Sequence, residues 1–366
     1  MTTEPILLTP GPLTTRIETR RAMLKDWGSR DPAFIALTAE LRTRLLGVCN
    51  GGATHEAVPL QGSGTFILEA AVVTLIRPED RLLVLANGAY GERMIEICRR
   101  HGRQVEALRW EEDRPVDPTA VAEALAQDPS ISHVALVHCE TTTGILNPLE
   151  AVAAAVAAAG RALIVDAMSS FGALPIDLAA TPVAALLASS NKCLEGVPGL
   201  GFAIVERERL AQAKGASPSM SLDLHDQWRG LEANGQWRFT PPVQVVAALV
   251  EALRLLEAEG GPPARRARYQ ANFDLLADGM AARGFPLFLN RTLQAPIIAT
   301  FRPPGQRPFS FDGFYSSLAE RGFVIYPGKL TREDSFRIGC IGALEPADFK
   351  RLLAAIDDVL AGAEKA

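Results

Sequence analysis

Cysteine and histidine are scarce in this sequence, and neither is arranged as a disulfide framework or a metal site requires. The chain has 366 residues, with five cysteines and five histidines. No two cysteines are spaced as C-x-x-C, and the histidines lack a spacing typical of metal ligands. We therefore expect reduced thiols, no disulfides and no bound metal. The cysteines are Cys49, Cys98, Cys139, Cys193 and Cys340.

An excess of positive charge and a long apolar run are also missing. The formal net charge is −5, whereas a nucleic-acid partner requires a clustered basic face. The longest apolar run, residues 151–159, is much shorter than the ~20 residues of a membrane-spanning helix. Residues 1–5 lack the basic segment and apolar core of a signal peptide. We expect a cytoplasmic protein that binds neither nucleic acid nor membrane.

The middle of the chain alternates between helix and strand patterns. This alternation predicts an α/β fold with a mainly parallel sheet and helices on both faces. In such sheets, ligands bind beyond the carboxyl ends of the strands. The predicted strands are 81–85, 105–108, 133–138, 162–166 and 199–205, and the predicted helices are 66–76, 91–101, 117–127 and 148–159.

A second, smaller unit follows a glycine–proline cluster. A long alanine- and leucine-rich helix, 243–259, ends at Gly260-Gly261-Pro262-Pro263, which is the best candidate boundary. The remaining C-terminal sequence reads as a compact α+β unit. The N-terminal segment is too short to fold alone and is expected to pack on that unit. We therefore predict a large domain over 16–260 and a small domain formed by 1–15 and 261–366.

Two apolar runs end on residues whose combination points to pyridoxal phosphate chemistry. One run, 162–165, ends on Asp166, and another, 183–188, leads to Lys192. A lysine amine forms a Schiff base with the cofactor aldehyde, while a carboxylate keeps the pyridine nitrogen protonated. Taken singly, Asp166 is explained as a turn cap and Lys192 as a surface lysine with a buried stem. Their joint placement at one sheet edge favours the cofactor hypothesis.

Three further loops follow predicted strands or precede a predicted helix. Gly62-Ser63-Gly64-Thr65 precedes a helix and could bind a phosphate, or simply cap the helix. Tyr90 in a glycine-rich loop could stack on a flat ring or serve only in packing. Thr143 could bond a phenolic oxygen or stabilise a turn.

Arg337 could bind an acidic substrate, or pair with Glu333 or Asp334 at the surface.

Taken together, these residues resemble the 2-aminoethylphosphonate–pyruvate transaminases, a branch of the class V aminotransferases of PLP fold type I. The similarity covers nearly the whole chain. It is carried by segments 8–15, 26–29, 62–66, 87–91, 140–144, 166–172, 189–199, 236–242, 326–329 and 336–339. The segment around the lysine is specific to class V, whereas the N-terminal and Trp-Arg-Phe-Thr segments resemble the aminophosphonate branch.

The resemblance implies a fold, a reaction and a role for each matching residue. The expected fold has a seven-stranded type of sheet in the large domain. The expected reaction transfers the amino group of 2-aminoethylphosphonate to pyruvate, yielding phosphonoacetaldehyde and L-alanine in phosphonate catabolism. The protein would be a homodimer with shared active sites. Lys192 and Asp166 would be catalytic; Ser63, Gly64, Thr65, Tyr90, Thr143 and, from a second subunit, Thr240 would bind pyridoxal 5′-phosphate; Arg337, Thr14 and Thr15 would bind substrate.

Other functions remain open at this stage. An alanine–glyoxylate or serine–pyruvate transaminase of the same class would share the fold and the cofactor residues. A cysteine desulfurase-like enzyme would need a reactive cysteine on a flexible loop, and Cys340 instead falls in a strand-like stretch. A cofactor-binding regulator would need an added DNA-binding module, for which the chain has neither spare length nor a basic patch.

Overall fold

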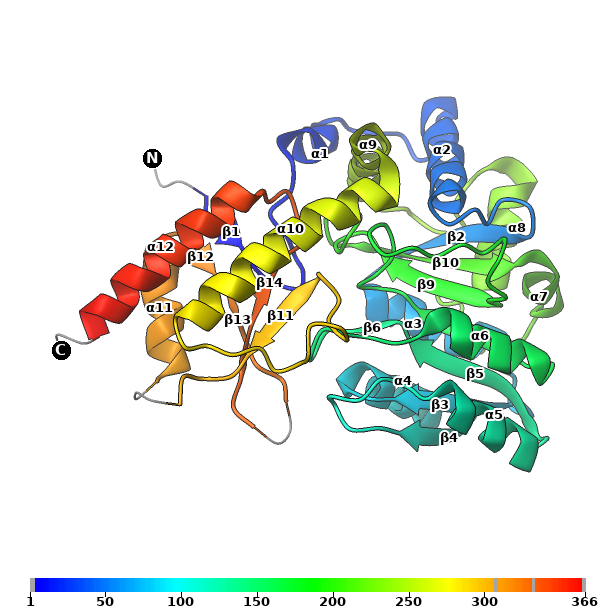
Figure 1. The fold of residues 1–366 in the computed structure, drawn as a ribbon. Helices are drawn as coiled ribbons and strands as arrows, with labels where there is room; N and C mark the ends of the chain where they lie inside the picture. The colour runs from blue at the N-terminus through cyan, green and yellow to red at the C-terminus, as the bar shows by residue number, and fades with distance from the viewer. Residues whose placement is uncertain (1–3, 306–308, 331–332, 364–366) are drawn as a thin grey trace.

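The computed structural model describes residues 4–305, 309–330 and 333–363, and its largest element is a seven-stranded sheet (Figure 1). The strand order is β2-β10-β9-β8-β5-β3-β4. Only β10 runs against its neighbours, so the predicted mainly parallel α/β sheet is confirmed. The strands are β2 (His55–Gln61), β3 (Arg81–Ala86), β4 (Gln104–Arg109), β5 (Ile131–Val137), β8 (Ala162–Asp166), β9 (Ala185–Ser189) and β10 (Leu200–Glu206).

Helices cover both faces of this sheet, because its central strands are apolar on both sides. The core on one face contains side chains of α2 (Pro32–Val48), α5 (Pro118–Gln127), α6 (Leu149–Ala158) and α9 (Val243–Glu259). The core on the other face contains side chains of α3 (Gly64–Leu75), α4 (Ala89–Arg100), α7 (Arg207–Gln212) and α8 (Leu224–Asn234). Two short N-terminal helices, α1 (Ile17–Arg21) and the 3-10 helix η1 (Ala22–Leu24), complete this part of the chain.

A smaller group of strands and helices surrounds a separate phenylalanine-rich core. The antiparallel sheet β11-β14-β13 is joined by the parallel pair β1-β12, through which the N-terminal segment packs on the C-terminal part. The elements are β1 (Ile6–Leu7), β11 (Ile298–Phe301), β12 (Phe323–Val324), β13 (Tyr326–Pro327), β14 (Phe336–Gly339), α10 (Gly261–Ala282), α11 (Phe311–Glu320) and α12 (Pro346–Ala363).

The long helix α10 runs from the end of α9 across this smaller group (Figure 1). A short hairpin, β6 (Cys139–Glu140) and β7 (Ile145–Leu146), follows β5 and lies toward the same group. An isolated β-bridge between Ile145 and Gln294 connects the hairpin to this smaller group. The carboxyl edge of the large sheet therefore faces the smaller strands.

Across the described ranges, none of the helices has the length and apolarity needed to cross a membrane.

Candidate active site

The turn after β9 holds Lys192 in a partly buried position at the carboxyl edge of the large sheet. The Gly196 N–H donates to the Ser190 carbonyl at 2.9 Å and closes the turn around Lys192. The Lys192 Nζ donates to the Pro10 carbonyl at 2.6 Å. Burial lowers the pKa of Lys192 to about 8, because the charged amine loses solvation. Its amine is therefore closer to the neutral, nucleophilic form at physiological pH than that of an exposed lysine.

The N-terminal segment reaches Lys192 because a glycine permits close contact. Gly11 has φ of +126°, a backbone conformation that residues with a side chain rarely adopt. A Cβ atom at Gly11 would stand 2.9 Å from the Asn191 carbonyl oxygen and 3.0 Å from the Lys192 Cδ. The Leu-Thr-Pro-Gly-Pro sequence thus lies directly against the lysine turn.

Asp166 is the last residue of β8, the strand next to β9. Its side chain is buried, and its Oδ1 accepts the Met168 N–H at 3.0 Å. Burial raises the pKa of Asp166 to about 6, although the Met168 N–H and the cations of Lys192 and Arg93 oppose this shift. A buried carboxylate of this kind is stabilised when a positively charged group binds beside it. The geometry therefore suits a protonated ring nitrogen.

The first turn of α3 has the features of an anion site. The helix begins at Gly64, two residues earlier than the sequence predicted, so Gly64 and Thr65 lie within its first turn. The first amides of a helix have no intrahelical acceptor, and they favour an anion. Ser63 precedes the helix, and its hydroxyl makes no capping hydrogen bond. In this structure the Ser63 side chain therefore does not cap the helix.

One cavity of about 170 Å³ brings these groups together. It lies where β5, β8 and β9 end and where α3 and α4 begin. Its walls include six of the predicted site residues: Ser63, Gly64, Thr65, Tyr90, Asp166 and Lys192. Thr143, Thr240, Arg337, Thr14 and Thr15 are not among the residues that line it.

Tyr90 is held at the cavity by groups that the sequence did not single out. Its N–H donates to the Glu140 Oε2 at 3.0 Å. Burial raises the pKa of Glu140 to about 7. Two cations lie near the Tyr90 ring: the Arg93 Cζ is 4.8 Å and the Lys329 Nζ 5.6 Å from its centroid. The Arg93 Nη1 also donates to the Thr65 Oγ1 at 3.4 Å. The only sequence signal for these residues is that they fall in or beside motif segments.

Arg337 on β14 is buried, so the alternative of a surface ion pair is wrong. Its Nε donates to the Pro327 carbonyl and its Nη1 to the Thr141 carbonyl, both at 2.9 Å. Glu333 binds Arg302 instead, at 2.7 Å. Burial lowers the pKa of Arg337 below its ordinary value. No ion pair joins Arg337 to a carboxylate in the part of the chain that the structure describes.

The predicted threonines have varied surroundings. Thr143 is buried; its hydroxyl donates to the Glu140 carbonyl at 3.4 Å and accepts the Ile145 N–H at 3.2 Å, which stabilises the β6–β7 turn. The Thr14 hydroxyl accepts the Leu7 N–H at 2.8 Å, and Thr15 is half-buried. Thr240 is exposed in a different hollow, beside Phe239.

Known proteins resemble this chain along nearly its full length. The family model described as aminotransferase class-V matches residues 27–318. The chain is 55% identical over 357 residues to 2-aminoethylphosphonate–pyruvate transaminase 2 of Burkholderia lata, covering 98% of this chain and 95% of the relative. It is 52% identical over 360 residues to 2-aminoethylphosphonate–pyruvate transaminase of Pseudomonas putida, covering 98% of each.

Solved structures show the same fold at lower identity. The pyridoxamine–pyruvate aminotransferase of Mesorhizobium loti superposes with a TM-score of 0.89 at 28% identity, covering 99% of this chain and 93% of that one. The alanine–glyoxylate aminotransferase of Nostoc gives 0.90 at 25% identity, covering 98% and 96%. The predicted fold type is confirmed. The chain belongs to the class V aminotransferases and, within that family, is similar to 2-aminoethylphosphonate–pyruvate transaminases.

Proposed function

We propose that this protein is a pyridoxal 5′-phosphate-dependent transaminase that transfers the amino group of 2-aminoethylphosphonate to pyruvate, in phosphonate catabolism. The products are phosphonoacetaldehyde and L-alanine. The observation that carries the proposal is the meeting of Lys192, Asp166 and the start of α3 at one cavity. When bound, the cofactor supplies an aldehyde that binds amines and a ring that withdraws electrons from the amino-bearing carbon.

The residues present fit this cofactor. The first-turn amides of α3, with Ser63, Gly64 and Thr65, suit its phosphate. Asp166 suits its ring nitrogen, since that buried carboxylate lines the cavity, where a cationic group can bind beside it. The Tyr90 ring, at the cavity wall, suits stacking on a flat ring. We assign Thr143 to the ring oxygen on the resemblance alone, because its hydroxyl is already bonded within its own turn.

Lys192 has two tasks in this proposal, covalent attachment and proton transfer. Its Nζ removes a proton from the amino-bearing carbon of the donor and later returns one to the acceptor carbon. A general base works best when its pKa lies near the operating pH, and burial brings the pKa of Lys192 to about 8. Asp166 keeps the opposite side of the site negatively charged while this proton moves.

The acidic ends of the substrates require cations. Arg337 is buried without a carboxylate partner among the described residues, and we assign it to the carboxylate of pyruvate and the phosphonate of the donor. The phosphonate stands one carbon farther from the reacting carbon and carries more charge. Arg93 and Lys329, both near Tyr90, could supply the additional attraction. Thr14 and Thr15 stay as further candidates; the Thr14 hydroxyl still has its proton to donate.

A panel of substrates tests the proposed reaction. Purified protein supplied with cofactor should form L-alanine and phosphonoacetaldehyde from 2-aminoethylphosphonate and pyruvate. Serine with pyruvate should react at least about 10-fold more slowly, since serine lacks the phosphonate. L-Alanine is a product of the proposed reaction and can return its amino group, so the alanine–glyoxylate pair is informative only beside the rate with the aminophosphonate. Efficient alanine–glyoxylate turnover without reaction of the aminophosphonate would instead support the runner-up function. Product chromatography with each pair makes this comparison.

The cysteine desulfurase alternative is disfavoured by the thiols. All five cysteines are buried and unpaired. Burial raises the pKa of Cys193 to about 12, and it also raises that of Cys340. A reactive cysteine needs a lowered pKa and exposure. Release of sulfide from cysteine by the purified protein would revive the alternative.

We also propose a homodimer in which Thr240 completes the partner's cofactor site. Two observations support it: Thr240 is exposed and away from the cavity of its own chain, and the adjacent Phe239 is 49% exposed. Phe66, which follows Thr65 at the start of α3, is likewise 53% exposed. Exposed aromatic side chains beside a site are typical of a protein interface. The mass in solution should be twice the 39.2 kDa of one chain, and a monomer would contradict the proposal.

Two coarser proposals concern organisation and location. We propose that residues 16–260 form one domain and that 1–15 with 261–366 form the other, supported by the separate phenylalanine-rich core of the smaller group. We propose a cytoplasmic location, supported by the five unpaired cysteines. Limited proteolysis near residue 260 and cell fractionation test these two points.

A further inference from the structure

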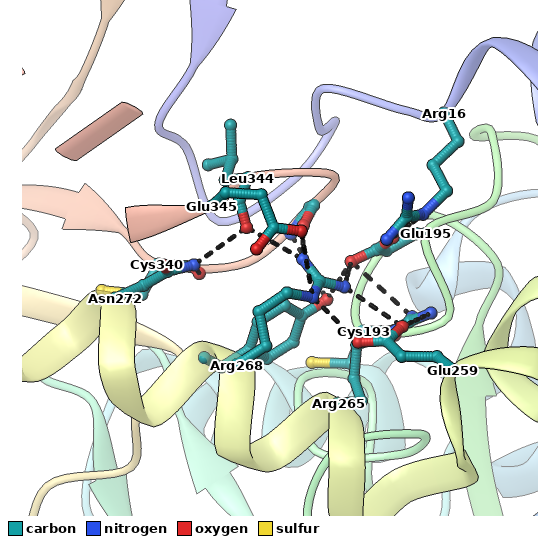
Figure 2. Close-up of polar contacts among 12 residues, drawn as sticks. Arg16, Cys193, Glu195, Glu259, Arg265, Arg268, Asn272, Cys340, Leu344 and Glu345 are labelled. Atoms are coloured by element: carbon teal, nitrogen blue, oxygen red, sulfur yellow. Dashed lines mark hydrogen bonds and ion pairs between the residues drawn. The ribbon is translucent and has the colours of Figure 1, made fainter. Parts of the chain in front are cut away.

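A buried charged cluster connects the lysine turn to the smaller group of strands (Figure 2). We call it the Glu195 cluster: Glu195, Glu259, Arg265, Arg268 and Tyr269. Glu195 lies three residues after Lys192 and is only 2% exposed. Its Oε1 accepts the Tyr269 hydroxyl at 2.6 Å and the Arg268 Nη2 at 2.7 Å. Glu259 accepts from both arginines. Two more charged groups approach the cluster from outside: the Arg16 Nε lies 3.9 Å from the Glu195 Oε2, and the Glu345 Oε1 lies 4.0 Å from the Arg268 Nε.

The cluster holds the lysine turn by its backbone as well as by charge. The Arg265 Nη1 donates to the Cys193 carbonyl at 2.7 Å. The Glu195 N–H donates to the Lys192 carbonyl at 2.8 Å. Glu195 itself has φ of +60°, an uncommon conformation for a residue with a side chain. Such a conformation persists where surrounding contacts enforce it, and here the buried carboxylate supplies them.

The same helix face also holds the chain just beyond Arg337. The Arg268 Nη1 donates to the carbonyls of Gly342 and Leu344, at 2.7 and 3.0 Å. The Gly342 N–H donates to the Tyr269 hydroxyl at 3.3 Å. Asn272 adds bonds to the carbonyls of Cys340 and Leu344. These contacts begin one residue after β14, the strand that carries Arg337.

The four α10 residues share one side of the helix because of their spacing. Arg265, Arg268, Tyr269 and Asn272 stand at i, i+3, i+4 and i+7, which is a single face of an α-helix. Helix α10 therefore contacts, with one rigid face, both the turn of Lys192 and the continuation of the Arg337 strand. Figure 2 shows the two sets of contacts side by side along the helix.

We propose that Glu195 is a positioning residue, which through α10 fixes the separation between Lys192 and Arg337. The inference rests on the proposed function, because it gives these two residues the reacting amine and the substrate acid. A fixed separation selects substrates by the distance between amino group and acid. In a rigid site, one methylene too many costs about 10- to 200-fold in specificity. The Glu195 cluster thus sets which distance between amino group and acid the site accepts in a donor.

The test compares 2-aminoethylphosphonate with 3-aminopropylphosphonate, its homologue with one more methylene. The wild-type protein should prefer the shorter donor in kcat/KM. Glu195→Gln keeps the side-chain volume but removes the charge that binds Arg268, so the preference should shrink by about 10-fold. Tyr269→Phe, which removes one hydroxyl from the cluster, should shrink it less. Asp357→Asn is the matched control: it removes the carboxylate charge that pairs with Arg283, just after the other end of α10, and should leave the preference unchanged.

A second readout does not depend on turnover. Glu195→Gln removes a negative charge three residues from Lys192 and leaves the guanidinium groups of Arg16, Arg265 and Arg268 with one carboxylate fewer. The absorbance change of the lysine–cofactor linkage should therefore titrate at lower pH in Glu195→Gln than in wild type. An unchanged length preference in folded Glu195→Gln and Tyr269→Phe would overturn the inference, whether or not the titration shifts. If the wild-type protein turned over neither phosphonate, the proposed function would fail, while the titration would still decide whether Glu195 acts on Lys192.

Discussion

Replacing Lys192 by Ala should reduce the rate of transamination by roughly 10⁴-fold or more, because it removes both the covalent anchor and the proton carrier. No other lysine stands at the cavity wall among the described residues. The protein should still fold, since within the described ranges the Lys192 side chain makes one hydrogen bond, to the Pro10 carbonyl. Initial rates with 2-aminoethylphosphonate and pyruvate measure the effect.

Two matched variants separate chemistry from charge. Lys192→Arg keeps a cation that can donate to Pro10, but guanidinium stays protonated and cannot serve as a base; it should be as inactive as Lys192→Ala. Lys214→Ala removes an exposed lysine outside the site and should retain full activity. More than a tenth of wild-type activity in either Lys192 variant would contradict the assignment.

Replacing Arg337 by Ala should raise the KM for 2-aminoethylphosphonate by roughly 100-fold or more, since a buried charged hydrogen-bonding partner contributes several kcal/mol to binding. Arg337 is 2% exposed, and in the described part of the chain its guanidinium has carbonyl partners but no carboxylate. Water would then have to replace a fixed cation beside the phosphonate. Steady-state kinetics at saturating pyruvate measure the change.

The controls for Arg337 use the same region. Arg337→Lys keeps the charge but loses the forked geometry, so it should recover part of the affinity. Arg302→Ala removes a nearby arginine that binds Glu333 at the surface, and it should leave the KM close to wild type. Circular dichroism shows whether each variant is folded. An unchanged KM in a folded Arg337→Ala protein would remove Arg337 from the substrate site.

The parallel core of the fold was predictable because each strand there is a short apolar run that ends in a polar loop. The edge strand β2 was not, because it contains Pro59, a residue that usually argues against a strand. An edge position tolerates a proline, since one side of the strand has no neighbour to receive an N–H. Helix α2 was also missed, although Asp31 followed by Pro32 is a usual helix start.

The place of a site residue was predictable where the residue ends its strand, as Asp166 ends β8, or lies in the turn just after it, as Lys192 does after β9. The roles of Arg93 and Lys329 were not predictable, because their approach to Tyr90 depends on how α4 and the β13 loop meet in space. The Glu195 cluster was equally hidden. Glu195 and Tyr269 are 74 residues apart, and only the packing of α10 against the lysine turn brings them together.

The most direct test of the account is chemical trapping of the Lys192 amine, on which the other predictions depend. Protein reconstituted with pyridoxal 5′-phosphate is reduced with borohydride, digested and analysed by peptide mass spectrometry. We predict a single stoichiometric adduct on Lys192, and none when 2-aminoethylphosphonate is added before the reductant. A protein that takes up no cofactor, or an adduct on a different lysine, would contradict the account.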